Sequence, residues 1–166
     1  MRFLKYVLFL VFTLNLQAQS LYPQWKSYFS YADVTAVTAG DDEVFATTTN
    51  AVLIFNVKTQ TTTTFGPLEG LRLQRVTALH YSEKFKKIII GNEDGSIQII
   101  DRKSGKVSYL DDILNKQALA PSLKVINAFT EFKGALYLAT NYGISVLNLN
   151  NNQFLDTYYI GSQGGY

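Results

Sequence analysis

The chain has 166 residues, 47% of them hydrophobic, and carries 15 Lys and Arg against 13 Asp and Glu, with no cysteine. A chain of this length and apolar content can bury the core of one domain, and its near balance of charge excludes the strongly basic footprint of a nucleic-acid-binding protein. Because there is no cysteine, no disulfide can hold the fold together, and burial and hydrogen bonding must do so.

The N-terminus has the pattern of an export signal. Arg2 and Lys5 precede an apolar run over residues 6–16, which is shorter than the roughly 20 residues that span a bilayer and has the length of a signal-peptide core. We predict a signal peptide over residues 1–18 and no other transmembrane segment. Its removal takes away two basic residues and leaves the mature chain, residues 19–166, with balanced charge.

After a strand near Trp25, the chain repeats one pattern over residues 34–65, 76–110 and 125–160. Each repeat has an apolar strand, a polar turn, an apolar hairpin and a fourth strand, with no helical periodicity between them. Four short antiparallel strands in about 40 to 50 residues are typical of a β-propeller blade. We therefore predict an all-β fold, a β-propeller of four-stranded antiparallel blades, with about three blades of an incomplete ring.

The central hairpin of each repeat is the clearest local feature. It lies at residues 44–57, 88–101 and 135–149, and in the third copy Gly143 can take the positive φ that a tight turn needs. In the second copy, Asp94-Gly95 predicts a type I′ turn.

Three blades are fewer than the about 4 to 8 of a closed propeller. We expect the chain to be the N-terminal part of a longer protein, whose ring the Trp25 strand closes. The outer faces of the first and third blades should then be apolar and uncovered. The isolated mature chain is expected to aggregate or to melt at low temperature.

The sequence shows no catalytic or metal-binding arrangement. His80 is the only histidine, and the other repeats have Thr38 and Thr130 at its position, so a hydrogen-bonding residue at the end of a strand is favoured over a catalytic one. Glu93 and Asp94 lack the alternating oxygen ligands of a calcium loop. We therefore expect no enzyme, no cofactor and no bound metal.

The connections between blades and the central hairpin turns should share one face of a propeller, and this is the predicted binding face. Of the two connections, residues 111–124 are the longer and allow a short helical turn, whereas residues 66–75 are compact. Tyr142 is expected to escape packing between blades because it lies in the turn itself. The candidate binding residues are Arg72, Arg75, Lys116, Lys124, Asn141 and Tyr142, with Asn50, Glu93 and Asp94 beside them. Their mixed charge indicates no clear site for an anionic ligand.

The repeats resemble the N-terminal propeller of the PorZ family of type IX secretion system proteins. The most specific segments are LYLATNYGI at residues 136–144 and DTYYIG at residues 156–161. The resemblance implies a cell-surface protein that is not itself an enzyme. It also implies work with the sortase that processes secreted cargo and delivery of the anionic lipopolysaccharide that anchors this cargo. It assigns no functional residue.

The predicted function is therefore a non-enzymatic surface scaffold or binding module of the type IX secretion system. Single blade motifs also resemble two-component regulator propellers, so the alternative is the periplasmic, ligand-sensing propeller of a hybrid two-component regulator. A third hypothesis, a propeller lyase or glycosidase, needs acid and base residues in further blades.

Overall fold

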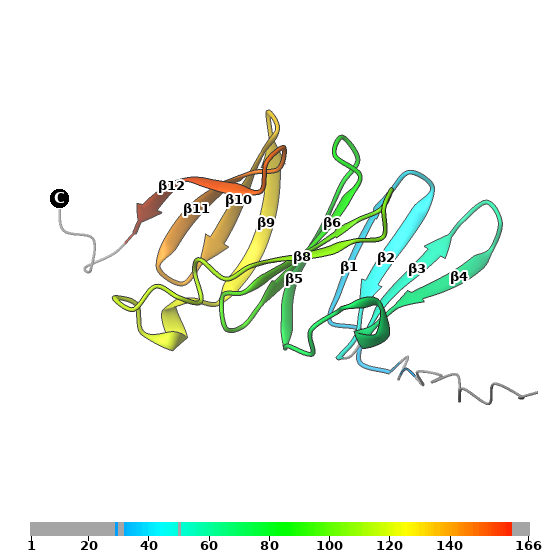
Figure 1. Cartoon of the computed structure of the whole chain (residues 1–166), viewed down its shortest axis with the longest axis horizontal. Coiled ribbons are helices and arrows are strands. Elements are labelled where there is room, and N and C mark those ends of the chain that lie inside the picture. The colour runs from blue at the N-terminus through cyan, green and yellow to red at the C-terminus, as the bar shows by residue number, and fades with distance from the viewer. Residues whose placement is uncertain (1–28, 30–31, 50, 161–166) are drawn as a thin grey trace, which may run out of the picture.

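The computed structural model describes residue 29, residues 32–49 and residues 51–160, and within these ranges it contains three four-stranded antiparallel sheets (Figure 1). Each sheet is built from consecutive strands that pair in chain order. The prediction of an all-β fold with three four-stranded blades and no closed ring is confirmed. The predicted signal peptide and the Trp25 strand lie outside the described residues.

The strand bounds follow the repeat closely. The first blade contains β1 (Ala36–Gly40), β2 (Glu43–Thr47), β3 (Val52–Asn56) and β4 (Thr61–Phe65); the second contains β5 (Val76–Ser82), β6 (Lys87–Asn92), β7 (Ile97–Asp101) and β8 (Val107–Leu110); the third contains β9 (Ile126–Phe132), β10 (Ala135–Thr140), β11 (Gly143–Asn148) and β12 (Gln153–Tyr159).

Each connection between blades contains a short 3-10 helix, η1 (Pro67–Glu69) and η2 (Pro121–Leu123). The second was expected and the first was not. Pro67 fixes the φ of the first helical position, and the Glu69 carboxylate accepts a hydrogen bond from the Gly66 backbone N–H at 2.7 Å. This cap closes a helical turn within a segment whose composition indicated only a bend.

The inner strands of the middle blade are buried on both faces. Side chains alternate along β6, so Ile88 and Ile90 face the first blade while Ile89 faces the third, and all three are 0% exposed. Burial on both faces explains why this strand is continuously apolar instead of alternating with polar residues.

Two apolar clusters result, one on each side of the middle blade. The first contains Phe45, Val52, Ile54, Leu71, Tyr81, Ile88, Ile90 and Ile100; the second contains Ala78, Ile89, Ile97, Ile99, Ile113, Ile126, Leu136, Leu138, Tyr142, Leu147 and Leu149. The connections contribute Leu71 and Ile113, so they belong to the packing between blades.

The outer faces of the first and third blades carry exposed apolar side chains, as expected. Val37 on β1 is 60% exposed and Tyr158 on β12 is 52% exposed. Among the described residues, no helix has the length and apolar character needed to cross a membrane.

The turn at Asp94-Gly95 differs from the prediction. A type I′ turn needs positive φ at both central residues, but here Gly95 is at +88° and Asp94 is not in the positive region. The Gly95 N–H donates to the Asn92 carbonyl at 3.1 Å, and the Asn92 N–H donates to the Ser96 carbonyl at 3.0 Å. The loop therefore has one more residue than a type I′ hairpin, and Gly95 takes up the left-handed position that follows a type I turn.

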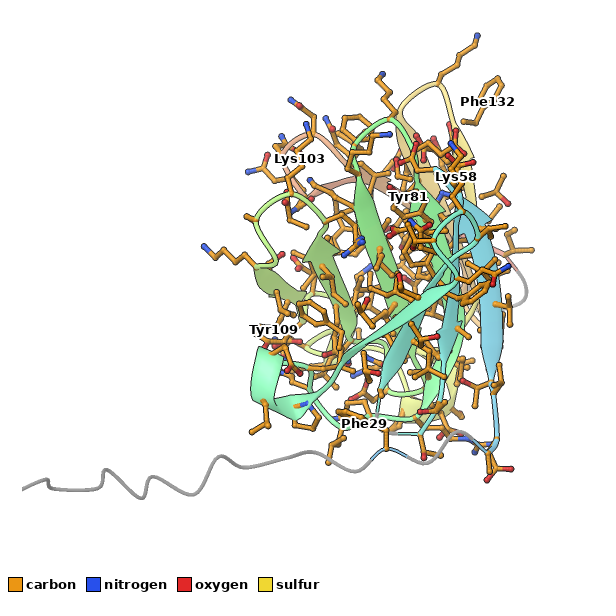
Figure 2. The ribbon with its side chains drawn as sticks, turned by 90° about the vertical axis from the view of Figure 1, so that its right-hand side faces the viewer. Phe29, Lys58, Tyr81, Lys103, Tyr109 and Phe132 are labelled. Carbon is orange, nitrogen blue, oxygen red and sulfur yellow. The ribbon has the colours of Figure 1, made fainter. Side chains whose placement is uncertain are left out.

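The blades present two opposite faces. The connection face carries the central hairpin turns and the two connections between blades, residues 66–75 and 111–125. The turn face carries the turns between the first and second strands and between the third and fourth strands of each blade. In Figure 2, Lys58, Lys103 and Phe132 lie on the upper, turn face, and Tyr109 lies towards the opposite end.

Candidate functional site

The connection face has a hollow of about 520 Å³ where the β6–β7 turn of the second blade meets the β10–β11 turn of the third. It is lined by Gln74, Arg75, Glu93, Asp94, Pro121, Ser122, Val125 and Asn141. Two of the six candidate binding residues, Arg75 and Asn141, therefore lie together, with Glu93 and Asp94 beside them. The others lie elsewhere on or beneath this face.

Arg75 is the basic group of this hollow that is open to solvent. Its Nη1 lies 3.0 Å from the Glu93 Oε1, and the two side chains are 76% and 49% exposed. Asn141, by contrast, is held at both ends, because its Oδ1 accepts from Asn127 Nδ2 at 2.8 Å and its Nδ2 donates to the Ser122 carbonyl at 2.7 Å. Arg75 can exchange its exposed partner for a ligand at little cost.

Arg72 holds the first connection. Its Nη1 lies 3.0 Å from both carboxylate oxygens of Asp111, and its guanidinium lies 3.8 Å from the centroid of the Tyr109 ring. Its backbone N–H and carbonyl bond to the amide group of Gln98, a side chain that is 1% exposed. Lys124 has a similar structural contact, since its Nζ donates to the Leu114 carbonyl at 2.6 Å.

The prediction that Tyr142 escapes packing is wrong. Its side chain is 4% exposed and belongs to the cluster between the second and third blades. The hydroxyl lies 2.6 Å from Ser145 Oγ, which gives the buried phenol a polar partner. Lys116 lies over the ring, with Nζ 5.1 Å from the centroid, so both residues take part in packing. That the connection face binds a partner stays a prediction.

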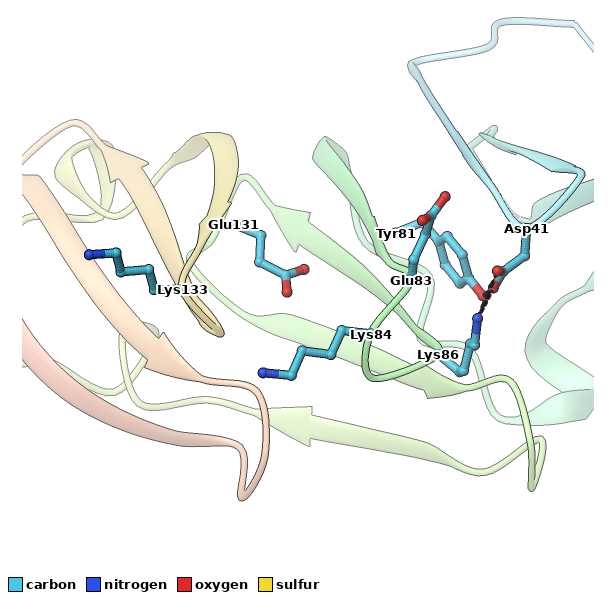
Figure 3. A pocket seen from close by; sticks show the side chains of 7 residues that line it. All are labelled: Asp41, Tyr81, Glu83, Lys84, Lys86, Glu131 and Lys133. Carbon is cyan, nitrogen blue, oxygen red and sulfur yellow. Dashed lines mark hydrogen bonds and ion pairs between the residues drawn. The ribbon is translucent and has the colours of Figure 1, made fainter.

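The turn face has a larger hollow, of about 620 Å³, that was not predicted from the sequence (Figure 3). Its lining residues come from three different repeats and are Asp41, Tyr81, Glu83, Lys84, Lys86, Glu131 and Lys133. Tyr81 lies on β5 and Glu131 on β9, whereas the other five are turn residues. No local motif in the sequence indicates that they converge.

Asp41 links the first two blades at this hollow. Its carboxylate accepts hydrogen bonds from Lys86 Nζ at 2.6 and 2.7 Å and from the Tyr81 hydroxyl at 2.6 Å. The hydrogen bond from Lys86 and then that from Tyr81 lower the pKa of Asp41. Burial, followed by the hydrogen bond to Asp41, raises the pKa of Tyr81. Asp41 thus joins the first blade to the second through an ion pair with Lys86 and a hydrogen bond from Tyr81.

His80 lies within β5, not at its end, because the strand continues to Ser82. Its Nε2 lies 3.2 Å from Glu131 Oε2 on β9, with the side chains 21% and 19% exposed. The hydrogen-bonding interpretation of His80 is confirmed, and its partner is on the next blade. Within the described ranges, no group of three or more His, Cys, Asp or Glu side chains could hold a metal ion.

We expect acid to weaken the contact at Asp41. Because the folded-state pKa of Asp41 is below its ordinary value, the contact stabilises the fold above that value and is lost as the pH falls through the folded-state pKa. The urea concentration at the unfolding midpoint should therefore decrease as the pH falls below about 4. Asp41→Asn or Lys86→Met should flatten this decrease. Lys106→Met, at an exposed turn, should retain the wild-type profile. An unchanged profile in Asp41→Asn would contradict the assignment.

The model of the family described as "TSS9, PorZ, N-terminal beta-propeller domain" matches residues 44–166. The chain belongs to this family. The match starts within β2 and includes the second and third blades completely, so the resemblance seen in the residues is confirmed.

Solved structures show the same fold. One is PorZ of Porphyromonas gingivalis, which is described as an essential bacterial surface component of the type IX secretion system. It is 23% identical to this chain, with a TM-score of 0.71, and the match covers 81% of this chain and 18% of the PorZ chain. The extracellular domain of the putative one component system BT4673 from B. thetaiotaomicron is 16% identical with a TM-score of 0.62, over 82% and 18%. The extracellular domain of the putative hybrid two component system BT3049 from B. thetaiotaomicron is 17% identical with a TM-score of 0.58, and the match covers 74% of this chain and 16% of that one.

The chain thus spans less than a fifth of the length of these three solved chains. A search of curated proteins found no match.

Proposed function

We propose that this chain is part of a non-enzymatic surface component of the type IX secretion system, in which the propeller serves as a scaffold and binding module. The observation that carries the proposal is the family match over residues 44–166. The surface location given for PorZ of P. gingivalis and the signal-peptide pattern of residues 1–18 support export to the cell surface.

The finer role that we propose is assistance to the sortase in processing secreted cargo and in attaching it to anionic lipopolysaccharide. This role rests on the resemblance of residues 136–144 and 156–161 to the PorZ family. The connection face is the proposed contact surface, and Arg75 is its most accessible basic group.

Deletion of the complete gene in its host tests the proposal. We expect secreted cargo to appear in the medium instead of on the cell surface, and the wild-type gene to restore attachment. Normal attachment in the deletion strain would exclude the proposed function.

Complementation with variants tests the face separately. Arg75→Glu should restore attachment only in part, because it replaces the accessible basic group of the connection face by a second acidic side chain beside Glu93. Lys106→Glu is the control, since it makes the same charge change on the turn face, away from the connection face. Full activity of Arg75→Glu would remove this face from the proposal.

The second candidate function is the sensing propeller of a hybrid two-component regulator. It is favoured by the likeness to the extracellular domain of BT3049. Reading the remainder of the open reading frame decides between the two, because a transmembrane helix followed by a histidine kinase would establish the sensor.

A further inference from the structure

Apart from Lys87, whose Nζ donates to the Leu149 carbonyl and to Asn152 Oδ1, the basic residues of the turn face form two groups. Those of the first group have carboxylate partners, such as Lys58 at 2.6 Å from Asp42 and Arg102 at 2.9 Å from Glu43. The second group is exposed and has no carboxylate within 4 Å among the described residues; its members are Lys84, Lys103, Lys106 and Lys133. The turn face therefore has cationic groups that are available to a partner.

Two of these lysines, Lys84 and Lys133, come from neighbouring blades and border the same space. Both line the large hollow at Asp41 and also a second hollow of about 380 Å³. The second hollow is lined by Lys84, Phe85, Lys133, Gly134, Ala135, Asn148, Asn150 and Leu155, with no carboxylate among them. Figure 3 shows both lysine side chains extending away from the contact between Asp41 and Lys86. The larger hollow also contains Asp41, Glu83 and Glu131, so it is at the smaller hollow that two ammonium groups without a neighbouring carboxylate favour an acidic partner.

Apolar side chains are exposed beside these lysines. Val146 pairs with Asp156 and Leu147 pairs with Phe154, so Leu155 is the extra residue of a β-bulge in β12. Bulges redirect side chains, and Leu155 is 61% exposed at the smaller hollow.

Phe132, next to Lys133, is 57% exposed and projects from the turn face in Figure 2. Lys133 Nζ lies 5.2 Å from the centroid of the Phe132 ring, and Lys133 and Leu155 line the smaller hollow together, so both apolar side chains neighbour this lysine. Apolar side chains within a polar rim are the usual composition of a protein docking surface.

The geometry favours a protein segment over a sugar. A sugar needs an open aromatic face, but the Phe85 ring has Lys84 Nζ at 5.1 Å and Lys87 Nζ at 5.9 Å from its centroid, and the Phe132 ring has Lys133 Nζ at 5.2 Å. We propose that Lys84, Lys133, Phe132 and Leu155 form a docking surface for a partner protein segment in which an apolar side chain is flanked by Asp or Glu. This surface lies opposite the connection face and goes beyond the proposed function.

A defined peptide tests the docking surface in the complete protein. The probe is a short fluorescent peptide in which leucines are flanked by Asp and Glu, and binding is followed by anisotropy at low salt and in about 0.5 M NaCl. We expect Lys84→Glu/Lys133→Glu to weaken binding about tenfold or more at low salt. Lys103→Glu/Lys106→Glu makes the same charge change on the same face and should bind as the wild type does.

Three comparisons complete the test. Phe132→Ser/Leu155→Ser should also weaken binding, and replacing the leucines of the peptide by serine should have the same effect on the wild type. Circular dichroism spectra and melting temperatures check that every variant is folded.

The proposal is overturned if the wild type does not bind the acidic peptide, if the two double lysine variants lose binding equally, or if the serine peptide binds as well as the leucine peptide. Binding of polygalacturonate without binding of the peptide would also overturn it, since the surface would then recognise a sugar. None of these outcomes depends on cargo attachment in the host, so failure here is distinct from failure of the proposed function.

Discussion

Replacing Gly143 by alanine is expected to destabilise the third blade by about 3 kcal/mol or more. Gly143 opens β11 with φ of +142°, a conformation that residues with a side chain rarely adopt. A Cβ at this position would lie 2.0 Å from the Tyr158 carbonyl oxygen and 2.9 Å from the Ile160 backbone nitrogen. These neighbours are backbone atoms of the paired strand and its continuation, so the clash cannot be relieved by a change of rotamer.

Urea unfolding and hydrogen exchange measure this effect. Protection should fall first in β11 and β12, which pair at Gly143 and Tyr159. Gly105→Ala is the matched control, because Gly105 also has positive φ, +71°, but its Cβ would meet no atom within 4 Å. The control should cost only about 1 kcal/mol. Equal losses in the two variants would show that φ alone, and not the contact with Tyr158, determines the need for glycine.

Replacing Ile89 by alanine is expected to cost about 3 kcal/mol and to loosen the third blade from the second. Ile89 is 0% exposed in the cluster between these blades. Removing its buried methyl and methylene groups loses apolar burial and leaves a cavity. The denaturation midpoint reports the total loss, and hydrogen exchange shows which blade opens.

Ile88 offers a matched comparison, since it is also 0% exposed but faces the first blade. Ile88→Ala should cost a similar amount while raising exchange in the first blade instead of the third. Leu68→Ala, at a side chain that is 59% exposed on η1, should stay within about 0.5 kcal/mol of the wild type. Exchange rising in the same blade for Ile88→Ala and Ile89→Ala would contradict the assignment of the two faces.

The strands could be predicted from the sequence because their causes are local. Apolar runs bounded by turn residues recur three times. In a run such as residues 88–90, the backbone N–H and C=O groups need hydrogen bonds to neighbouring strands, and the apolar side chains on both faces need burial between two layers. The sharing of one face by the central turns and the blade connections follows from the alternating direction of four strands. These features depend on periodicity and chain direction, which are visible in a single sequence.

The surroundings of individual side chains depended on the tertiary structure. Tyr142 lies in a turn but is buried, because the adjacent blade and Lys116 cover its ring. Asp41 reads as an ordinary turn residue, yet it accepts hydrogen bonds from Tyr81 and Lys86, which are 40 and 45 residues away. Such contacts are set by the angle and distance between blades.

The sequence by itself thus determined the repeat, the blade and the family resemblance. The tertiary structure alone decided which charges are neutralised and which remain available. Three of the predicted binding residues make contacts that support packing or the connections in the structure, namely Arg72, Lys116 and Lys124. Lys84 and Lys133, which belong to turns with no distinctive motif, border hollows of the turn face. Ion pairing between blades depends on the distance between charged atoms in space, and the number of residues that separate them in the sequence does not determine this distance.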